Sequence, residues 1–336
     1  MLKKGQEQIQ FNWIYIAVVG AVILLVFINI ASGIRKSSKT KLEIDAITYF
    51  DEIFTSVQAS ENTENSITLA GLELEVASDA DDCNRYTIKG SDLGGRSTEF
   101  VPLFGPNYIK KKILSYSLGW DMPFRVNYFL FLTSPEIAYV SIGNNAIFGE
   151  LPEHLTKEKV ARADDFVNQN YYKVRFFTTN EDMLSSVDAS LRKLNDEDVS
   201  AVYVNEGLKT VKYYQKKDGS FEELGETYYL DQTSMLAAIY TENLGAYECN
   251  MKKSIRRLNK FSAILKERVK TIQSSNLMPL CISSAYQEAE GMLSELESAT
   301  DTPEISRAAF SKISSIKERL TALNKELNKK SCPTVY

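Results

Sequence analysis

A long uncharged run near the N-terminus constrains this chain more than any other feature. Residues 13–31 contain no Asp, Glu, Lys or Arg. As a helix rising about 1.5 Å per residue they would span roughly 28 Å, the thickness of a bilayer's hydrocarbon core. The run therefore predicts a retained transmembrane helix. A cleaved signal peptide is the alternative, and it fits less well because the run is long and no small-residue cleavage site follows it before Arg35.

The orientation of this helix is not settled by its flanking charges. Lys3 and Lys4 precede it, whereas four cations follow it between residues 35 and 41, so the positive-inside rule favours a cytoplasmic C-terminal domain. Long domains nevertheless cross the membrane regardless of flanking charge, and the cysteines discussed below favour an oxidising exterior. We therefore expect a single-pass protein of the cell membrane with its C-terminal domain outside the cell.

The charges beyond the anchor limit the choice of partner. Residues 42–245 carry a net charge of −15, while residues 1–41 and 246–336 each carry +5. The whole chain has a formal charge of −5 and a pI of about 5.3, which argues against nucleic acid as a partner. The expected partners are the membrane and other proteins, including a second copy of this chain.

The pattern of apolar residues predicts an α+β fold. Ile47, Phe50 and Ile53 recur at helical spacing, which extends the anchor as one long helix to about residue 58. Period-two alternation then indicates antiparallel strands, and unbroken spacings of three and four after residue 246 indicate a helical bundle. The expected segments are a membrane anchor (1–35), a helix plus antiparallel β domain (36–150), a small α/β domain (151–245) and a three-helix bundle closed by a disulfide (246–336).

Individual elements follow from the same patterns. The first β domain is expected to include a strand over residues 136–142. In the α/β domain we expect helices at 157–168, 181–194 and 232–240, and strands at 172–177, 199–204, 211–215 and 228–230. The last bundle helix is expected to begin at Thr302-Pro303-Glu304, a favourable cap, first-turn proline and first-turn acid.

Helix geometry suggests how the four cysteines pair. Cys281 precedes one predicted helix and Cys332 follows the next. A short connection makes these helices antiparallel, so both cysteines lie at the open end of the hairpin. Their disulfide would close a loop of about 50 residues and stabilise the fold by about 4 kcal/mol. Cys249 lies roughly 35 Å away along the preceding helix, which leaves Cys83 as its partner by elimination. Four reduced thiols in a cytoplasmic domain are the alternative.

Residues that would carry chemistry are few. His154 is the single histidine, no Walker loop is present, and no cluster has the spacing of a metal site. We therefore expect no catalytic residue, cofactor or metal, and hence no enzyme. A group of cations on one side of the first bundle helix is either a solvated face or a contact for an acidic partner or an anionic lipid. This basic patch consists of Lys252, Lys253, Arg256, Arg257 and Lys260.

The N-terminal leader carries a resemblance to known proteins. Lys3-Lys4-Gly5-Gln6-Glu7 before an apolar helix resembles the leader of archaeal class III (type IV pilin-like) prepilins. This resemblance implies cleavage between Gly5 and Gln6, and a helix that first anchors the subunit and later packs in a filament core. The apolar run here starts only at Trp13, and Gln10 stands where the family has glutamate.

A second resemblance extends further along the chain. Residues 5–13, 118–124 and 128–135 are similar to single-pass membrane proteins of small-genome archaea, a group without an assigned activity. The leading hypothesis is thus a membrane-anchored extracytoplasmic surface protein that acts through protein contacts. The alternatives are a pilin-like filament or secretion-machine subunit, and a membrane-tethered enzyme or solute-binding protein, which a deep pocket with convergent polar groups would favour.

Overall fold

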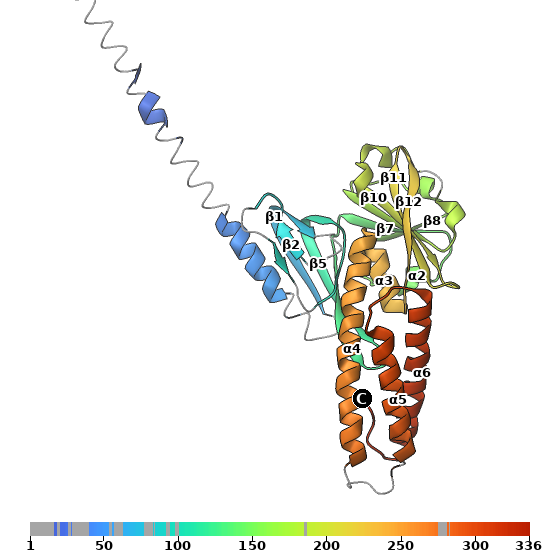
Figure 1. Ribbon diagram of the computed structural model, residues 1–336. Coiled ribbons are helices and arrows are strands. Elements are labelled where there is room, and N and C mark those ends of the chain that lie inside the picture. Colours follow the sequence, from blue (N-terminus) through green and yellow to red (C-terminus); the bar gives the residue numbers. More distant parts are fainter. Residues whose placement is uncertain are drawn as a thin grey trace, which may run out of the picture.

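Two six-stranded sheets and three long helices make up most of the chain that the computed structural model describes (Figure 1). The fold is α+β, as expected, with two mixed sheets and a C-terminal helical region. The described residues are 17–18, 21–25, 28, 40–53, 56, 63–76, 83, 85–91, 95–97, 101–184, 187–274, 281 and 283–336.

The first sheet has the strand order β3-β2-β1-β5-β6-β4. Neighbouring strands are antiparallel except for β4, which runs parallel to β6. Burial alternates along β5, which matches the period-two pattern of its sequence. The strands are β1 (Glu64–Val76), β2 (Arg85–Ile88), β3 (Arg96–Ser97), β4 (Leu103–Phe104), β5 (Tyr108–Asp121) and β6 (Arg125–Thr133).

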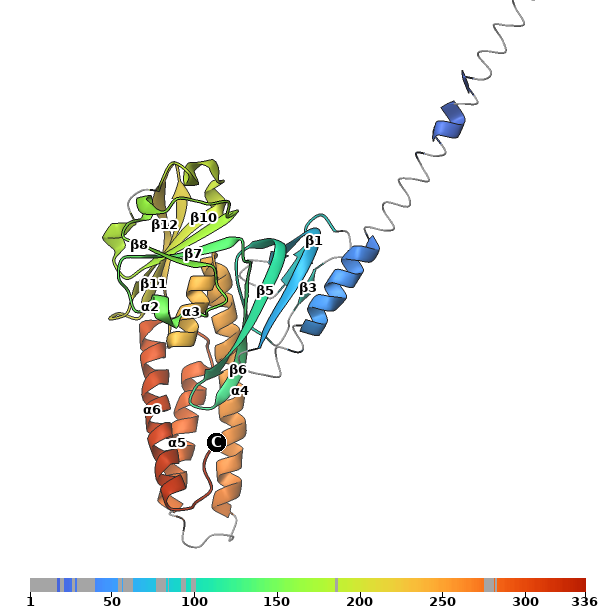
Figure 2. The ribbon, with the colours of Figure 1, turned by 180° about the vertical axis from the view of Figure 1, so that it is seen from behind.

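A helix over residues 40–53 covers one face of the first sheet (Figure 2). Its buried residues Ile47, Phe50 and Ile53 belong to one apolar cluster with the inward-facing residues of β1 and β2. The ring of Phe50 lies edge-on to that of Tyr86, with centroids 6.2 Å apart. The predicted helix is therefore confirmed over residues 40–53.

The second sheet has the order β12-β11-β10-β9-β7-β8. Strands β8, β7, β9 and β10 run parallel, and β11 and β12 continue the sheet antiparallel. Every residue of β7 and β9 is buried, as expected of parallel strands covered on both faces. The strands are β7 (Ile137–Ile142), β8 (Lys157–Val160), β9 (Lys173–Thr178), β10 (Val199–Asn205), β11 (Thr210–Lys217) and β12 (Ser220–Tyr228).

The expectation that the strand near residues 136–142 belongs to the first sheet is wrong. β7 pairs with β8 and β9 in the second sheet. β6 ends at Thr133, and the short Ser134-Pro135-Glu136 connection turns the chain from one sheet into the other. An uninterrupted apolar strand carries no local mark of which sheet it joins, because both would bury it.

Two predicted helices of the α/β segment are also wrong. Residues 157–168 form β8 and a single 3-10 turn at Ala163–Asp165. Among the described residues of the second range, Glu181–Met183 and Leu191–Lys193 each form a 3-10 turn. Local side-chain bonds compete with the helix: the backbone N–H of Asp182 donates to Asn180 Oδ1 (3.1 Å), and that of Ser190 to Asp188 Oδ1 (2.7 Å). Short polar side chains favour turns for this reason.

The remaining helices agree with the sequence pattern. α3 (Gln232–Tyr240) begins with a capping box between Asp231 and Ser234. The bundle consists of α4 (Leu244–Ser274), α5 (Ser283–Thr300) and α6 (Arg307–Lys329). The predicted start of the last helix is wrong by a few residues, because the Ser306 side chain caps the helix by accepting from the backbone N–H of Ala309. The short α2 (Ile147–Glu150) lies between β7 and β8.

The open end of the bundle is closed as expected, since Cys281 and Cys332 form a disulfide with Cα atoms 5.7 Å apart. The C-terminal tail also folds back there: the Tyr286 hydroxyl donates to the carbonyl of Pro333 (2.8 Å), and the Val335 N–H donates to Asn324 Oδ1 (2.6 Å). The disulfide therefore holds both the hairpin and the tail that packs on it.

Replacing Cys281 and Cys332 together with serine is expected to lower the melting temperature while helical content stays near native. The link spans 51 residues, so its loss costs about 4 kcal/mol in the chain-entropy model, or roughly 10 °C. Far-UV circular dichroism during heating measures both quantities, with Thr334→Ser in the same tail as control. Non-reducing peptide mapping that joins Cys281 to Cys249 would contradict the layout.

The predicted anchor lies mostly outside the described residues, and so do Gly5 and Gln6 at the predicted leader cleavage. The described positions within it, residues 17–18, 21–25 and 28, are helical. Their large apolar side chains are exposed, with 57% of Val18 and 60% of Leu24 accessible. Within the described ranges, no helix combines the length and apolar character needed to cross a membrane.

Candidate functional site

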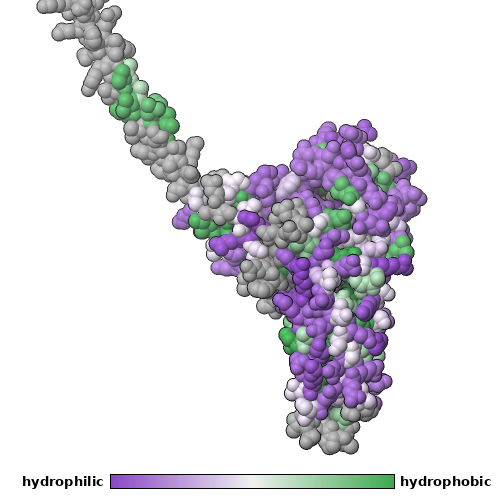
Figure 3. Space-filling view, viewed as in Figure 1, coloured by the Kyte–Doolittle hydropathy of each residue, from purple (hydrophilic) through white to green (hydrophobic). Residues whose placement is uncertain are grey.

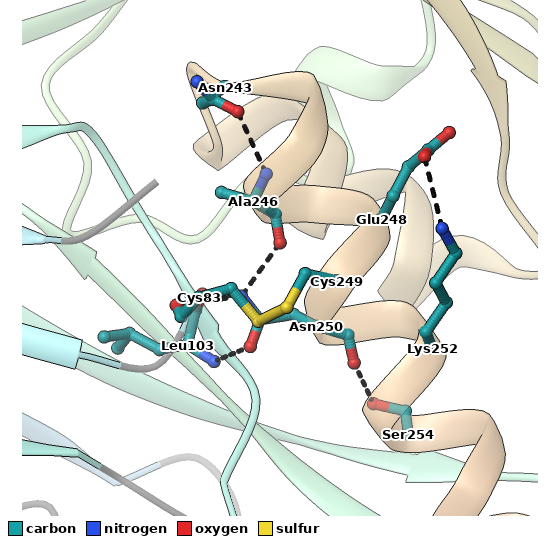
Figure 4. Close-up of a disulfide and its surroundings, with 9 residues drawn as sticks. All are labelled: Cys83, Leu103, Asn243, Ala246, Glu248, Cys249, Asn250, Lys252 and Ser254. Carbon is teal, nitrogen blue, oxygen red and sulfur yellow. Dashed lines mark hydrogen bonds and ion pairs between the residues drawn. A yellow bond between two sulfur atoms is a disulfide. The ribbon is translucent and has the colours of Figure 1, made fainter. Parts of the chain in front are cut away.

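A disulfide between Cys83 and Cys249 joins the first sheet to the start of α4 (Figure 4). The two Cα atoms lie 5.9 Å apart, and both residues are buried. This is the pairing expected by elimination, and it links positions 166 residues apart. Because α4 continues into the bundle, the disulfide connects the first sheet covalently to the bundle.

Asn250 lies beside this disulfide and completes the edge of the first sheet. Its Oδ1 accepts from the backbone N–H of Leu103 (3.1 Å), and its Nδ2 donates to the Leu103 carbonyl (2.8 Å). β4 is an edge strand, and the fully buried carboxamide makes the two hydrogen bonds to Leu103 that a further strand would otherwise make. The same Nδ2 donates to the carbonyls of Cys83 (3.4 Å) and Ala246 (3.0 Å).

A buried ion pair links the two sheets to each other. Lys173 Nζ on β9 lies 2.6 Å from Glu242 Oε2 in the α3–α4 connection, with both side chains at least nine-tenths buried. The same carboxylate oxygen accepts from the backbone N–H of Asn107 (3.0 Å), at the start of β5. Lys173 Nζ also lies 4.0 Å from the ring centroid of Tyr108. One carboxylate therefore holds both sheets together.

Tyr108 extends this network to the 3-10 turn (Asp196–Asp198) directly before β10. Its hydroxyl donates to Asp198 Oδ1, and its ring stacks on that of Tyr172 with centroids 5.9 Å apart. Burial, followed by the hydrogen bond to Asp198, raises the pKa of Tyr108 above its ordinary value. The phenol therefore stays protonated at neutral pH and remains a donor to the carboxylate.

Arg175, two residues after Lys173 on the same face of β9, binds the end of α3. Its guanidinium donates to the carbonyls of Ile239 (3.1 Å), Ala238 (3.3 Å) and Thr241 (2.6 Å). These are carbonyls that a helix C-terminus leaves without internal partners. Burial lowers the pKa of Arg175 from its ordinary value, although a guanidinium stays charged at physiological pH. We call Lys173, Glu242, Tyr108, Asp198 and Arg175 the polar junction.

The polar junction was not predicted from the sequence. Its one signal is the presence of Lys173 and Arg175 at alternate positions of a strand whose other residues are mostly apolar. Asn250 has a similar signal, because it falls on the buried face of α4 with Tyr247, Met251 and Ser254. Within the polar junction each charged group contacts an opposite charge, a hydroxyl or backbone carbonyls, so the arrangement is suited to fixing the two sheets and α3 against one another.

The structure brings the five cations of the basic patch onto one stretch of α4. Lys252 pairs with Glu248 (3.7 Å), on the side of the helix away from the disulfide (Figure 4). The Arg257 guanidinium lies 5.6 Å from the ring of Phe261 and lines a cavity of about 210 Å³ with Arg125. Arg256 and Lys260 are exposed. The patch is therefore partly solvated and partly engaged in local contacts.

Comparison of the chain with family models, curated proteins and solved structures finds no match.

Proposed function

We propose that this chain is a membrane-anchored protein whose folded body is displayed outside the cell and acts through contacts with other proteins. The pairing of all four cysteines into two disulfides carries the proposal. Disulfides persist in oxidising compartments and are rare in the cytoplasm. One of them closes the bundle and the other joins the bundle to the first sheet, so both secure the architecture.

The described part of the predicted anchor supports attachment to a membrane. Large apolar side chains are exposed there, at Val22, Ile23, Leu24, Leu25 and Ile28. Figure 3 shows a patch of hydrophobic surface on this segment, away from the largely hydrophilic body. Apolar surface costs about 25 cal/mol per Å² in water, and insertion into a bilayer would remove that cost.

The body is built for rigid presentation. Two disulfides, Asn250 and the polar junction fix the first sheet, the second sheet and the bundle together. Binding by a preorganised surface avoids the entropy cost of ordering it. The basic patch on α4 gives this surface a region suited to acidic groups on a partner protein.

Full-length protein is expected in the membrane fraction, and deletion of residues 1–35 is expected to make it soluble.

A protease added to intact cells should digest the region beyond about residue 40, because the proposal places this region outside. An epitope tag at the C-terminus reports digestion, and an intracellular marker protein reports cell integrity. Digestion only after lysis would reverse the topology and contradict extracytoplasmic display.

A pilin-like subunit is the second candidate, and one observation favours it. The helix of residues 40–53 packs by one face on an antiparallel part of the first sheet, while the described apolar positions before it are exposed. An exposed apolar helix leading into a sheet domain suits packing against copies of itself. N-terminal sequencing of the mature protein separates the candidates, since a first residue of Gln6 would favour the pilin-like subunit.

A further inference from the structure

A groove lies where α6 meets the second sheet. Its walls come from the β10–β11 turn at residues 207–209, the end of β12, and the first two turns of α6. Its volume is about 270 Å³. Three segments distant in the sequence therefore form one concave surface, separate from the polar junction and the basic patch.

The groove has an apolar, aromatic lining. Tyr229, Leu230 and Phe310 line it and are largely buried, while Leu208 at the turn is 47% exposed. The Tyr229 hydroxyl is buried and has no hydrogen-bond partner among the described residues. Burial, with a smaller contribution from Glu206, raises the pKa of Tyr229 to about 12. The phenol is therefore neutral at physiological pH, and an apolar side chain can pack on its ring.

Two cations border this lining. Lys209 and Arg307 both line the groove, and neither makes an ion pair within the described part of the chain. Lys209 Nζ lies 5.2 Å from the centroid of the Tyr229 ring. Lys209 itself has a φ of +56°, in the left-handed region that non-glycine residues rarely adopt. The turn is held by the Leu208 N–H, which donates to Asn205 Oδ1 (3.0 Å).

The volume of the groove limits how much of a ligand it can enclose. Pockets for whole small molecules measure roughly 300–1,000 Å³. This groove, at about 270 Å³, lies just below that range and accommodates one large side chain. A longer ligand would place one residue in the groove and its neighbours along the rim. Carboxylates on those neighbours would complement Lys209 and Arg307.

We infer that this groove docks an acidic segment of a partner protein, with one aromatic or large aliphatic side chain inserted between Tyr229 and Phe310. Carboxylates flanking that side chain pair with Lys209 and Arg307. The inference rests on the proposed function, because it names the chemistry of the partner. A lipid headgroup is disfavoured, because α6 lies on the opposite side of the body from the helix of residues 40–53 that leads to the predicted anchor (Figures 1 and 2).

Binding of a defined peptide to the full-length protein in detergent tests this inference. The probe is a fluorescein-labelled peptide with the sequence Asp-Glu-Phe-Glu-Asp, followed by fluorescence anisotropy. Reversing both rim charges (Lys209→Glu with Arg307→Glu) should raise the dissociation constant by at least about tenfold. Ser314→Trp, which fills the groove without changing charge, should raise it similarly.

The matched control reverses two exposed cations outside the groove, Lys193→Glu with Arg268→Glu, and should change the dissociation constant by less than about twofold. A peptide with alanine in place of phenylalanine should bind at least about tenfold more weakly. Melting curves confirm that each variant is folded, and Ser314→Ala provides a conservative second variant at the groove wall.

Three results would overturn the inference. They are no saturable peptide binding below about 1 mM, equal losses in the rim and control variants, and binding to phosphatidylserine vesicles that competes with the peptide at the groove. None of them bears on the protease test of topology. Failure of the groove thus remains distinguishable from failure of the proposed display outside the cell.

Discussion

Replacing Glu242 with alanine is expected to lower the free energy of unfolding by about 3–5 kcal/mol, the cost of breaking a buried ion pair by removing one partner. The Lys173 ammonium would remain buried with its counter-charge removed, and the Asn107 N–H would lose its acceptor. Urea unfolding of the full-length protein in non-ionic detergent, followed by circular dichroism, measures the change.

Two control variants isolate the buried charge as the cause. Lys173→Met combined with Glu242→Leu removes both charges together and should recover most of the lost stability. Glu267→Ala breaks the exposed Glu267–Lys270 pair, whose Nζ and Oε1 atoms lie 2.7 Å apart, and should cost far less stability than Glu242→Ala because solvent screens exposed charges. If Glu242→Ala costs no more than Glu267→Ala, the buried pair does not hold the sheets together.

Replacing Cys83 and Cys249 together with alanine should destabilise the protein by about 5 kcal/mol, more than the loss of the Cys281–Cys332 link. In the chain-entropy model the stabilisation grows with the logarithm of the loop length, and this link spans 166 residues against 51 for the other. The same urea unfolding measures it, with the double serine variant of the shorter link as the comparison.

Asn250 provides a second attachment between the first sheet, at β4, and α4, which remains when the Cys83–Cys249 disulfide is removed. Its bonds to Leu103 do not involve sulfur, so β4 should stay attached to α4 in the double alanine variant. Hydrogen exchange at the Leu103 amide would report this attachment. A smaller loss of stability than for the shorter link would contradict the loop-length account and indicate residual structure in the unfolded chain.

The bundle and both cysteine pairings were predictable because their signals are local or geometric. Apolar residues repeat regularly along α4 and α6, and the short connection between the last two helices places Cys281 near Cys332. The start of α6 was less predictable, because Thr302 and Ser306 are both suitable caps. The polarity of the cap residue alone does not select between them.

The features that the sequence predicted wrongly or not at all depend on contacts between distant parts of the chain. Apolar residues between 157 and 194 are spaced much as on helices, yet side chains such as Asn180 and Asp188 stabilise turns instead. The polar junction depends on Lys173 and Glu242, which are 69 positions apart and carry no local mark of their pairing. The groove likewise combines the β10–β11 turn with α6, and one sequence does not indicate that these segments meet.

The Cys83–Cys249 disulfide changes how the protein would respond to mechanical tension. A pull between the predicted anchor and the bundle would run along the backbone to Cys83, across the sulfur–sulfur bond, and on along α4 from Cys249. Strands β2 to β12 and helix α3 lie between these two cysteines in the chain and are therefore outside that covalent path. The second sheet would therefore bear little of the force on an anchored molecule. The same holds for the part of the α6 groove that this sheet forms.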